Sequence, residues 1–458
     1  MEKHKADWKV FYKQVFMLII PMAIQNMINV GITATDVLML GRVGEKVLSG
    51  SSLAGQIQFI MTLFLFGITS GTTVLTAQYW GKRDTRSIEK IMAMGMVAAV
   101  GAGLVFTLGA ELFPEHLLRI YTSDPEVIAE GTKYIRIVAL SYILMCMTQV
   151  YLYIMRSIER VIIATVVYST SLVINIVLNG LLIFGMFGFP KFGIVGAAVA
   201  TLTARVAEFG IVLWYAIYKN KVVRFRIRDM WKIDKLLFKD FIIYAVPVLI
   251  NELLWGMGSS ANTAIIGHLG SAAVAANSVA QVSRQMAMVV AFGVSNATAI
   301  YLGKTIGEKK YDLAKLYGKK FFELSIITGA IGGLLILAAA PVVKHFMVLS
   351  PEAQNYLTFM FFVMSYFSLC QSINTTLIVG VLRSGGDTKY GMFIDLVSMW
   401  GFSIILGAVT AFYLHASVKV VYVILMSDEV LKIPLSVRRF RSDKWIRNIT
   451  RSTIEETK

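Results

Sequence analysis

Residues 15–40 read VFMLIIPMAIQNMINVGITATDVLML, and this stretch decides the class of the fold. It is apolar and longer than the roughly 20 residues that a helix needs to cross the hydrocarbon of a bilayer. Four polar side chains interrupt it at steps of three, four and three residues, a spacing that places them on one helix face. An ionised carboxylate in hydrocarbon costs about 2.5 kcal/mol or more, so the acid is expected to face a wet cavity or a partner. The four residues are Asn26, Asn29, Thr33 and Asp36.

The whole chain has the composition of a membrane protein. Of its 458 residues, 56% are hydrophobic and 16% charged, and the mean hydropathy is +0.67, whereas a soluble protein carries about 25% charged residues. Long apolar runs predict an all-α integral membrane protein with twelve transmembrane helices and no room for a soluble catalytic domain. The predicted spans are 14–40, 51–79, 88–112, 133–155, 161–187, 193–218, 239–266, 276–303, 320–343, 354–382, 389–414 and 417–434.

The net charge of +16 would suit a nucleic-acid partner, but the distribution of the basic residues argues against one. Most of the 44 Lys and Arg fall in the N-terminal segment, the C-terminal tail and the links that follow even-numbered spans. Lys and Arg concentrate in loops on the cytoplasmic side of membrane proteins. We therefore expect cytoplasmic N and C termini, a multi-pass protein of the inner (cytoplasmic) membrane, and no nucleic-acid partner.

The chain repeats itself at a shift of 226 residues, where Pro21 aligns with Pro247 and identical glycines follow. Each half has an even number of spans, so both halves enter the membrane from the same side as parallel repeats. We predict two six-helix lobes, residues 1–222 and 239–458, the second with a basic cytoplasmic tail. A basic cytoplasmic linker, residues 223–238, joins them. Duplicated halves suit alternating access, in which the halves rock around a fixed site.

The polar stripe of the first span recurs in the seventh. At the same shift its four positions map onto Glu252, Trp255, Ser259 and Asn262. Each half therefore carries one carboxylate where the other half carries Asn. Asp36 aligns with Asn262, and Glu252 aligns with Asn26. The two acids lie at different depths along equivalent helices.

These acids are the candidates for ion coupling. A buried acid can exchange a proton, and an ionised acid can hold a cation such as Na⁺. We assign ion coupling to Asp36 and Glu252, each of them also a candidate Na⁺ ligand, and to Asp395 in the eleventh span. The alternatives are that the first two acids merely pair with Arg284 or a backbone amide, and that Asp395 is only solvated.

Two arginines lie inside predicted spans. Arg284, in the eighth, is a candidate counter-ion of Glu252 or Asp395, while Arg205 and Glu208 are three residues apart on one helix and can neutralise each other. The residues expected to line a substrate cavity are Asn26, Asn29, Thr33, Trp255, Ser259, Asn262 and Arg284.

Several segments resemble the multidrug and toxic compound extrusion (MATE) transporters. Residues 36–44, DVLMLGRVG, look like the first-helix signature of that family, and residues 262–270 look like its second-half counterpart. Residues 382–388, LRSGGDT, are similar to the junction of the tenth and eleventh helices, and residues 193–198 to the turn into the sixth. The resemblance implies a twelve-helix, two-lobed fold that exports organic cations against an inward flow of Na⁺ or H⁺.

The resemblance also implies roles for two acids. An Asp of the first helix, here Asp36, takes part in ion coupling in the family, and Glu252 is the candidate for a seventh-helix Glu that does so in one subgroup. That subgroup has a further acid in the tenth helix. Residues 370–374, CQSIN, contain no acid, so that ion site requires Asp395 as a substitute.

The leading hypothesis is an antiporter that exports lipophilic organic cations in exchange for Na⁺ or H⁺, working in the bilayer as a monomer with no cofactor besides the coupling ion. The alternative is a flippase for lipid-linked oligosaccharides of the same superfamily, which Arg205 and Arg284 would favour. An enzyme is not expected, because the sequence has no HExxH, no nucleophile elbow and no Cys/His metal cluster.

Overall fold

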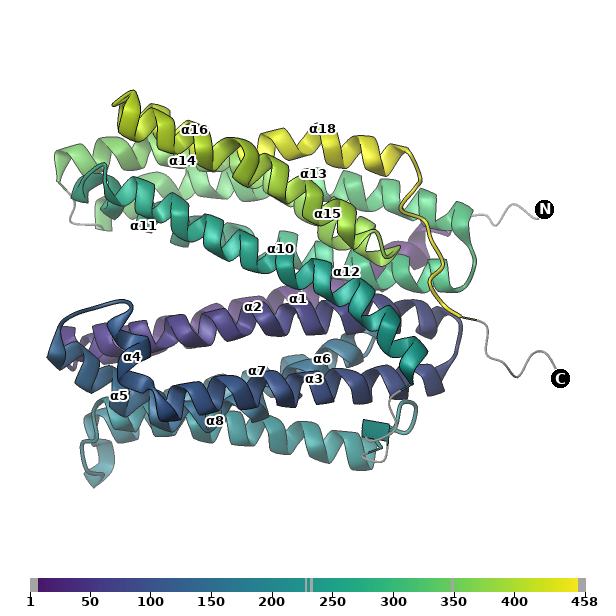
Figure 1. Cartoon of the computed structure of the whole chain (residues 1–458), viewed down its shortest axis with the longest axis horizontal. Coiled ribbons are helices and arrows are strands. Elements are labelled where there is room, and N and C mark those ends of the chain that lie inside the picture. Colours follow the sequence, from purple (N-terminus) through teal and green to yellow (C-terminus); the bar gives the residue numbers. More distant parts are fainter. Residues whose placement is uncertain (1–6, 227–228, 231–233, 347–349, 452–458) are drawn as a thin grey trace. The chain divides into compact units, whose positions relative to one another are not determined.

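The computed structural model describes residues 7–226, 229–230, 234–346 and 350–451, and within these ranges its regular elements are all helices (Figure 1). Several of the long helices end at a glycine. The elements of the first half are α1 (Trp8–Gly41), α2 (Glu45–Gly81), α3 (Thr85–Leu112), α4 (Pro114–Arg119), α5 (Pro125–Ala139), α6 (Tyr142–Ser157), α7 (Ile162–Phe184), η1 (Met186–Gly188), α8 (Ile194–Trp214) and η2 (Tyr215–Lys219).

The second half is built in the same way from long apolar helices, several of which contain π-helical turns. Its elements are α10 (Lys235–Gly267), α11 (Ser271–Ala287), α12 (Val289–Gly307), α13 (Tyr311–Phe346), α14 (Pro351–Thr375), η3 (Thr376–Leu382), α15 (Thr388–Asp395), η4 (Leu396–Ile404), α16 (Ile405–Ala408), η5 (Val409–Tyr413), α17 (Val418–Leu425) and α18 (Asp428–Arg441).

The predicted all-α membrane fold is confirmed. Among the described residues ten helices are long and apolar enough to cross a membrane, or eleven if α5 and α6, bent by 52°, form one span. The predicted span 417–434 corresponds to the short α17 and the polar α18, which meet at Met426 and Ser427. A total of twelve spans and the cytoplasmic location of the termini stay predictions.

The chain forms two compact units. The C-terminal unit consists of Met1–Ala23, Ala77–Arg83 and Ile250–Lys458, and the N-terminal unit consists of Ile24–Thr76 and Asp84–Leu249. Helices α1 and α10 therefore each pass from one unit into the other, two residues after an internal proline. The two crossing points are equivalent in the repeat. The predicted lobe boundaries at residues 222 and 239 stay a prediction, because the units follow spatial compactness and not sequence halves.

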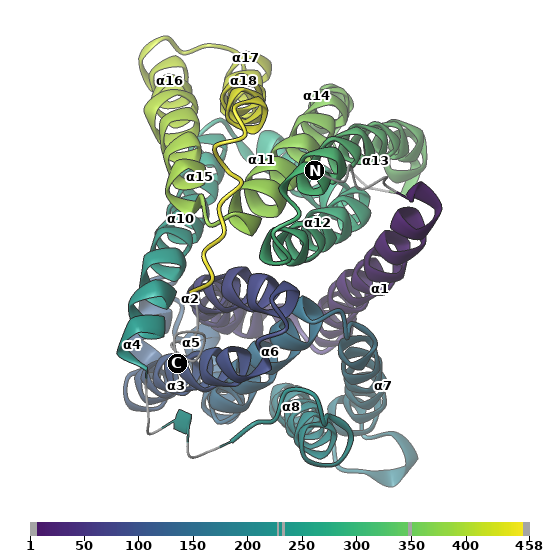
Figure 2. The same ribbon diagram turned by 90° about the vertical axis from the view of Figure 1, so that its right-hand side faces the viewer.

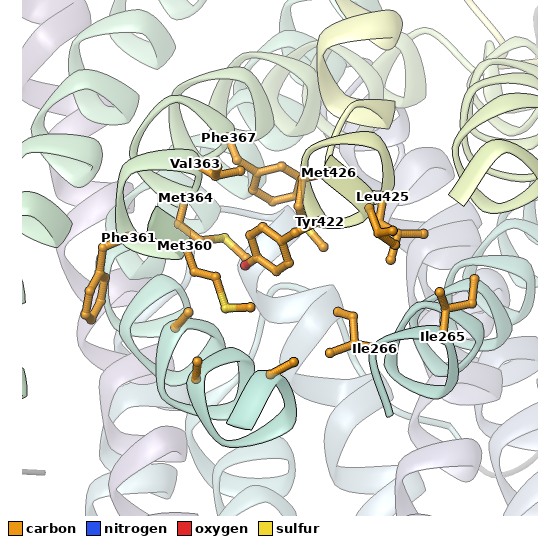
Figure 3. Packing of buried hydrophobic residues seen from close by; sticks show 14 of the residues in the cluster. Ile265, Ile266, Met360, Phe361, Val363, Met364, Phe367, Tyr422, Leu425 and Met426 are labelled. Carbon is orange, nitrogen blue, oxygen red and sulfur yellow. The ribbon is translucent and has the colours of Figure 1, made fainter. Parts of the chain in front are cut away.

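Apolar packing dominates the interior of the C-terminal unit. Met360, Met364 and Phe367 of α14 pack with Tyr422 and Met426 at the C-terminal end of α17 (Figure 3). These side chains are almost fully buried. Methionine adapts its shape to irregular gaps, which suits helices that meet at varied angles. The packing holds the start of α18 against α14.

The C-terminal segment after α18 is fastened to the end of α2 within the same unit (Figure 2). The buried Gln78 amide donates hydrogen bonds to the carbonyls of Ser384 (2.7 Å) and Arg447 (3.0 Å) and accepts one from the Ile449 N–H (2.8 Å). Trp445 is fully buried. Gly385 permits the close passage of this segment, because a Cβ there would lie 1.6 Å from the carbonyl oxygen of Trp445.

Candidate functional site

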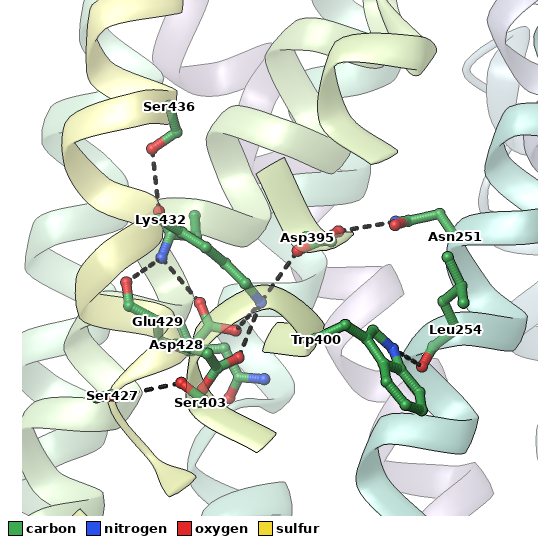
Figure 4. Close-up of polar contacts among 12 residues, drawn as sticks. Asn251, Leu254, Asp395, Trp400, Ser403, Ser427, Asp428, Glu429, Lys432 and Ser436 are labelled. Carbon is green, nitrogen blue, oxygen red and sulfur yellow. Dashed lines mark hydrogen bonds and ion pairs between the residues drawn. The ribbon is translucent and has the colours of Figure 1, made fainter. Parts of the chain in front are cut away.

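The C-terminal unit contains a buried ionic network centred on Lys432 of α18 (Figure 4). Its ammonium nitrogen lies 3.0 Å from one oxygen each of Asp395, Asp428 and Glu429. The Lys432 side chain is only 3% exposed. Buried charges are stable only when they are paired and hydrogen-bonded. One ammonium among three carboxylates leaves an excess of acids in this network.

Amide side chains satisfy the remaining oxygens of two of these acids. Asn251 of α10 donates from Nδ2 to Oδ2 of Asp395 (2.8 Å), and Asn374 of α14 donates to Oε2 of Glu429 (2.8 Å). Ser436 in turn donates to Oδ1 of Asn374 (3.0 Å). The network therefore joins α10, α14, α15 and α18 through side chains that are mostly buried.

Local helix geometry explains how α18 presents three of these groups. Asp428 and Glu429 lie four and three residues before Lys432, so all three side chains occupy neighbouring positions on one helix face. Ser427 begins the helix, and both acids lie in its first turn, where the helix dipole favours negative charge. Asp395 ends α15 and precedes the π-helical η4, a kind of distortion that is frequent at functional sites.

Glu252 lies beside this network and pairs with a different cation. Oε1 of Glu252 accepts a hydrogen bond from Arg383 Nη2 at 2.9 Å, and the two side chains are 18% and 5% exposed. Arg383 follows the π-helical η3. Two residues further along α10, Trp400 Nε1 donates to the carbonyl of Leu254 (3.0 Å). Together these contacts tie α10 to the link after the tenth predicted span and to the eleventh predicted span.

The structure gives Arg284 different partners from those expected. Its guanidinium donates to Oε1 of Gln371 (2.7 Å) and to Oε1 of Gln281 (2.9 Å), and it lies over the Phe367 ring at 5.7 Å. The cations that contact Glu252 and Asp395 are Arg383 and Lys432. The counter-ion role expected of Arg284 is therefore wrong in this conformation, because these two cations already occupy the positions beside the acids.

The N-terminal unit contains the second polar cluster, around Asp36 of α1. Asn179 of α7 donates from Nδ2 to Oδ1 of Asp36 (2.6 Å) and to Oδ1 of Asn175 (3.0 Å). Both asparagines are buried, whereas Asp36 is half-buried. Near this cluster Arg205 and Glu208 of α8 form the predicted ion pair at 2.8 Å, which confirms that pairing.

The remaining stripe residues differ in burial. Asn29, Thr33 and Ser259 are exposed, whereas the other members are half-buried. The Thr33 hydroxyl donates to the carbonyl of Asn29 (3.2 Å). Asn26 Nδ2 and Asn262 Oδ1 are buried atoms without a hydrogen-bond partner in the described structure. Their role in lining a substrate cavity stays a prediction.

The structure brings Glu252 and Asp395 into one region of the C-terminal unit and places Asp36 in the other unit. Within the described ranges no group of three or more His, Cys, Asp or Glu is arranged to hold a metal ion. The three carboxylates around Lys432 enclose its ammonium instead. Na⁺ ligation by Asp36 or Glu252 stays a prediction.

Sequence reasoning missed several residues of these clusters. Asn175 and Asn179 recur at one-turn spacing inside the apolar run 161–187, a signal like that of the first stripe. Asp428, Glu429 and Lys432 show the spacing of helical ion pairs inside the predicted span 417–434, but the spacing does not indicate that Asp395 joins them. Arg383 was assigned to a cytoplasmic link. The pairing of Arg383 with Glu252 has no signal in the sequence.

Known proteins match the chain along most of its length. The MatE family matches residues 21–181 and 247–409. YoeA of Bacillus subtilis, a probable multidrug resistance protein, is 24% identical over 417 residues, which cover 90% of this chain and 89% of the relative. NorM of Thermotoga maritima, also a probable multidrug resistance protein, is 23% identical and covers 97% of this chain and 96% of the relative.

Solved structures share the fold. A multidrug resistance MATE family transporter in an outward-facing conformation superposes with a TM-score of 0.85 at 18% identity, covering 94% of this chain and 96% of that one. A Vibrio cholerae MATE transporter gives a TM-score of 0.84 at 17% identity, covering 95% of this chain and 98% of that one.

Long apolar helices with buried polar clusters inside them define the class of this protein as a multi-pass membrane transporter. The two matched ranges begin at Pro21 and Pro247, the prolines that the internal repeat aligns. The chain belongs to the MatE family, as the sequence resemblance predicted.

Proposed function

We propose that the protein is a secondary active antiporter that exports organic cations in exchange for inward-moving H⁺ or Na⁺. It works as a monomer in the cytoplasmic membrane. The observation that carries the proposal is Asp36, a half-buried carboxylate in an apolar helix whose partner is the Asn179 amide at 2.6 Å. An acid held by a neutral amide keeps a negative charge that a proton, a metal cation or an organic cation can neutralise. The names of its curated relatives support a drug as the cargo.

The proposed cycle uses this charge in both half-reactions. With the site open to the outside, the coupling ion neutralises the acid and displaces the organic cation. The ion-loaded protein then reopens to the cytoplasm, where the ion leaves and a new cation binds. Only this competition for one charge is needed to couple the two flows.

A flippase for lipid-linked oligosaccharides is the second candidate. A solved transporter of the broader MOP superfamily, from Pyrococcus furiosus, is described as having a binding pocket of reversed polarity that suggests a different function, and it superposes on this chain with a TM-score of 0.84. Anionic lipid phosphates require basic side chains. Here Arg205 pairs with Glu208, whereas Arg284 donates to the neutral Gln281 and Gln371 and is the residue that would favour the flippase. The Asp36 carboxylate favours the antiporter.

The test is export of a fluorescent organic cation from cells that carry the protein. Each run is repeated with external Na⁺ replaced by K⁺ and with a protonophore added, and cells carrying the Asp36→Asn variant provide the background. Export that one treatment stops supports the antiporter and identifies its ion. Absence of export under all conditions, with the protein present in the membrane, contradicts the proposal and favours the flippase.

A further inference from the structure

We infer that Lys432 is a built-in cation of the C-terminal unit: it fills the carboxylate cluster of Asp395, Asp428 and Glu429 and thereby closes it to Na⁺. The inference adds ion specificity to the proposed function. It rests on that function only for the conclusion about which ion drives transport. Whether the cluster binds Na⁺ is a property of the protein alone and can be measured without transport.

The first step is the geometry at the ammonium. A lysine ammonium has three N–H donors and no acceptor. Lys432 Nζ has one carboxylate oxygen of each of the three acids at 3.0 Å, so each donor has an anionic acceptor. A Na⁺ ion entering the cluster would need the same oxygens, and it would lie beside a positive charge that repels it.

The second step is the state of the other oxygens. Asp395 Oδ2 accepts from Asn251 and Glu429 Oε2 accepts from Asn374, each at 2.8 Å. Both amides donate through Nδ2, so these two carboxylate oxygens already have N–H partners, while Oδ1 of Asn251 is buried without a hydrogen-bond partner in the described structure. The carboxylates thus pair with the Lys432 ammonium and with the amide N–H groups. A Na⁺ ion would have to displace these amides as well as Lys432.

The third step is that Lys432 is held in this position by its own helix. Lys432 is on the same helix as two of its three acids, and its long side chain is almost fully buried. The Ser436–Asn374–Glu429 hydrogen bonds fix the following turn of α18 to α14. The ammonium is therefore a permanent member of the cluster, whereas a free ion would exchange with solvent.

The experiment measures Na⁺ binding by the purified full-length protein as a change in its thermal unfolding midpoint when K⁺ is replaced by Na⁺ at constant ionic strength. All variants carry Asp36→Asn, so that a response comes from outside the first polar stripe. With Lys432 intact we expect no Na⁺-specific shift. Lys432→Met removes the charge and retains the length of the side chain, and we expect it to gain a Na⁺-specific rise of about 2 °C or more.

Three further variants locate the response. Lys432→Arg keeps the positive charge and is expected to show no gain. Adding Glu429→Gln to Lys432→Met removes one carboxylate and is expected to abolish the gain. Lys432→Met combined with Asp428→Asn leaves fewer unpaired negative charges in the cluster. This double variant replaces Lys432→Met if the single variant does not fold.

Two results would overturn the inference. One is a Na⁺-specific shift in the protein that retains Lys432. The other is a folded Lys432→Met protein, alone or with Asp428→Asn, that gains no response to Na⁺. Neither result depends on export, so a failure of the antiporter proposal and a failure of this inference are distinguishable.

Discussion

Replacing Asp36 with Asn should abolish export while leaving the protein folded. The substitution keeps the shape of the side chain and keeps an oxygen that can accept the 2.6 Å hydrogen bond from Asn179. It removes the charge. A charge-assisted hydrogen bond becomes a neutral one, which costs about 1 kcal/mol. At the same time, the free-energy cost of keeping a carboxylate half-buried disappears. We therefore expect a net change in the free energy of unfolding within about 1 kcal/mol.

The effect on ion and drug binding should be much larger. Two unit charges 4 Å apart attract by about 4 kcal/mol at an effective dielectric constant near 20, and each 1.4 kcal/mol is a factor of ten in affinity. Loss of the carboxylate should thus weaken binding of an organic cation roughly 1000-fold. In cells, export of a fluorescent cation should fall to background at normal protein levels.

The matched control for Asp36 is Thr33→Ala. Thr33 lies one turn away on the same stripe, is exposed, and donates only to the carbonyl of Asn29 in its own helix. Its loss should change export less than about threefold, since it removes no charge. Normal export by Asp36→Asn, or equal losses in the two variants, would refute the assigned role of the Asp36 charge.

The remaining predictions concern contacts within each unit. Arg383→Met leaves the Glu252 carboxylate (18% exposed) unpaired and should destabilise the protein by about 3 kcal/mol, measured as a lower thermal midpoint. Arg86 donates to both oxygens of Asp229 at 2.6 and 2.8 Å and so holds the pKa of this linker carboxyl below its usual value. Asp229→Asn should therefore cost about 1 kcal/mol at neutral pH, because Arg86 is half-exposed. The difference from the unmodified protein should begin to shrink below about pH 4 and disappear as the pH falls through the lowered pKa of Asp229. Gly385→Ala should displace the C-terminal segment, since its Cβ would lie 1.6 Å from a backbone oxygen, and should speed proteolysis there.

Each of these predictions has a comparison that isolates its cause. Arg438→Met removes an exposed arginine of α18 and should leave the thermal midpoint unchanged. Gly101→Ala adds a methyl group where no atom lies within 4 Å and should not alter proteolysis of the tail. A stability difference for Asp229→Asn that does not shrink when the pH is lowered far enough to protonate Asp229 would show that packing, and not the ion pair, is responsible.

The sequence predicts the helical membrane fold well because one physical constraint dominates it. Every backbone group in a bilayer must find its hydrogen bond within the helix, so long apolar runs can form little else. The repeat adds the position of the crossovers: Pro21 and Pro247 align, and α1 and α10 change units two residues after them. A proline removes one backbone donor and allows a bend at that point.

The charge partners could not be predicted, because they depend on which helix faces meet. Lys432 follows two acids at helical spacing, but it belongs to a polar helix after a break at Met426 and Ser427, so no apolar face indicates which helix it meets. Arg383 ends a π-helical stretch, and the extra residue per turn rotates it relative to a regular helix. An apolar run of this kind contains no sign of such a turn.

The two units hold their acids in different ways, and this difference leads us to predict a division of roles. In the N-terminal unit Asp36 accepts its hydrogen bond from an amide, which leaves its charge uncompensated by that contact. In the C-terminal unit Glu252 and Asp395 each lie within 3.0 Å of a cation fixed to the chain. A carboxylate bound to a fixed cation gains little from a mobile one, because the ligand must first break the existing pair. We therefore predict that an ion gradient acts most strongly on Asp36, while the acids of the other unit chiefly hold α10, α15 and α18 together.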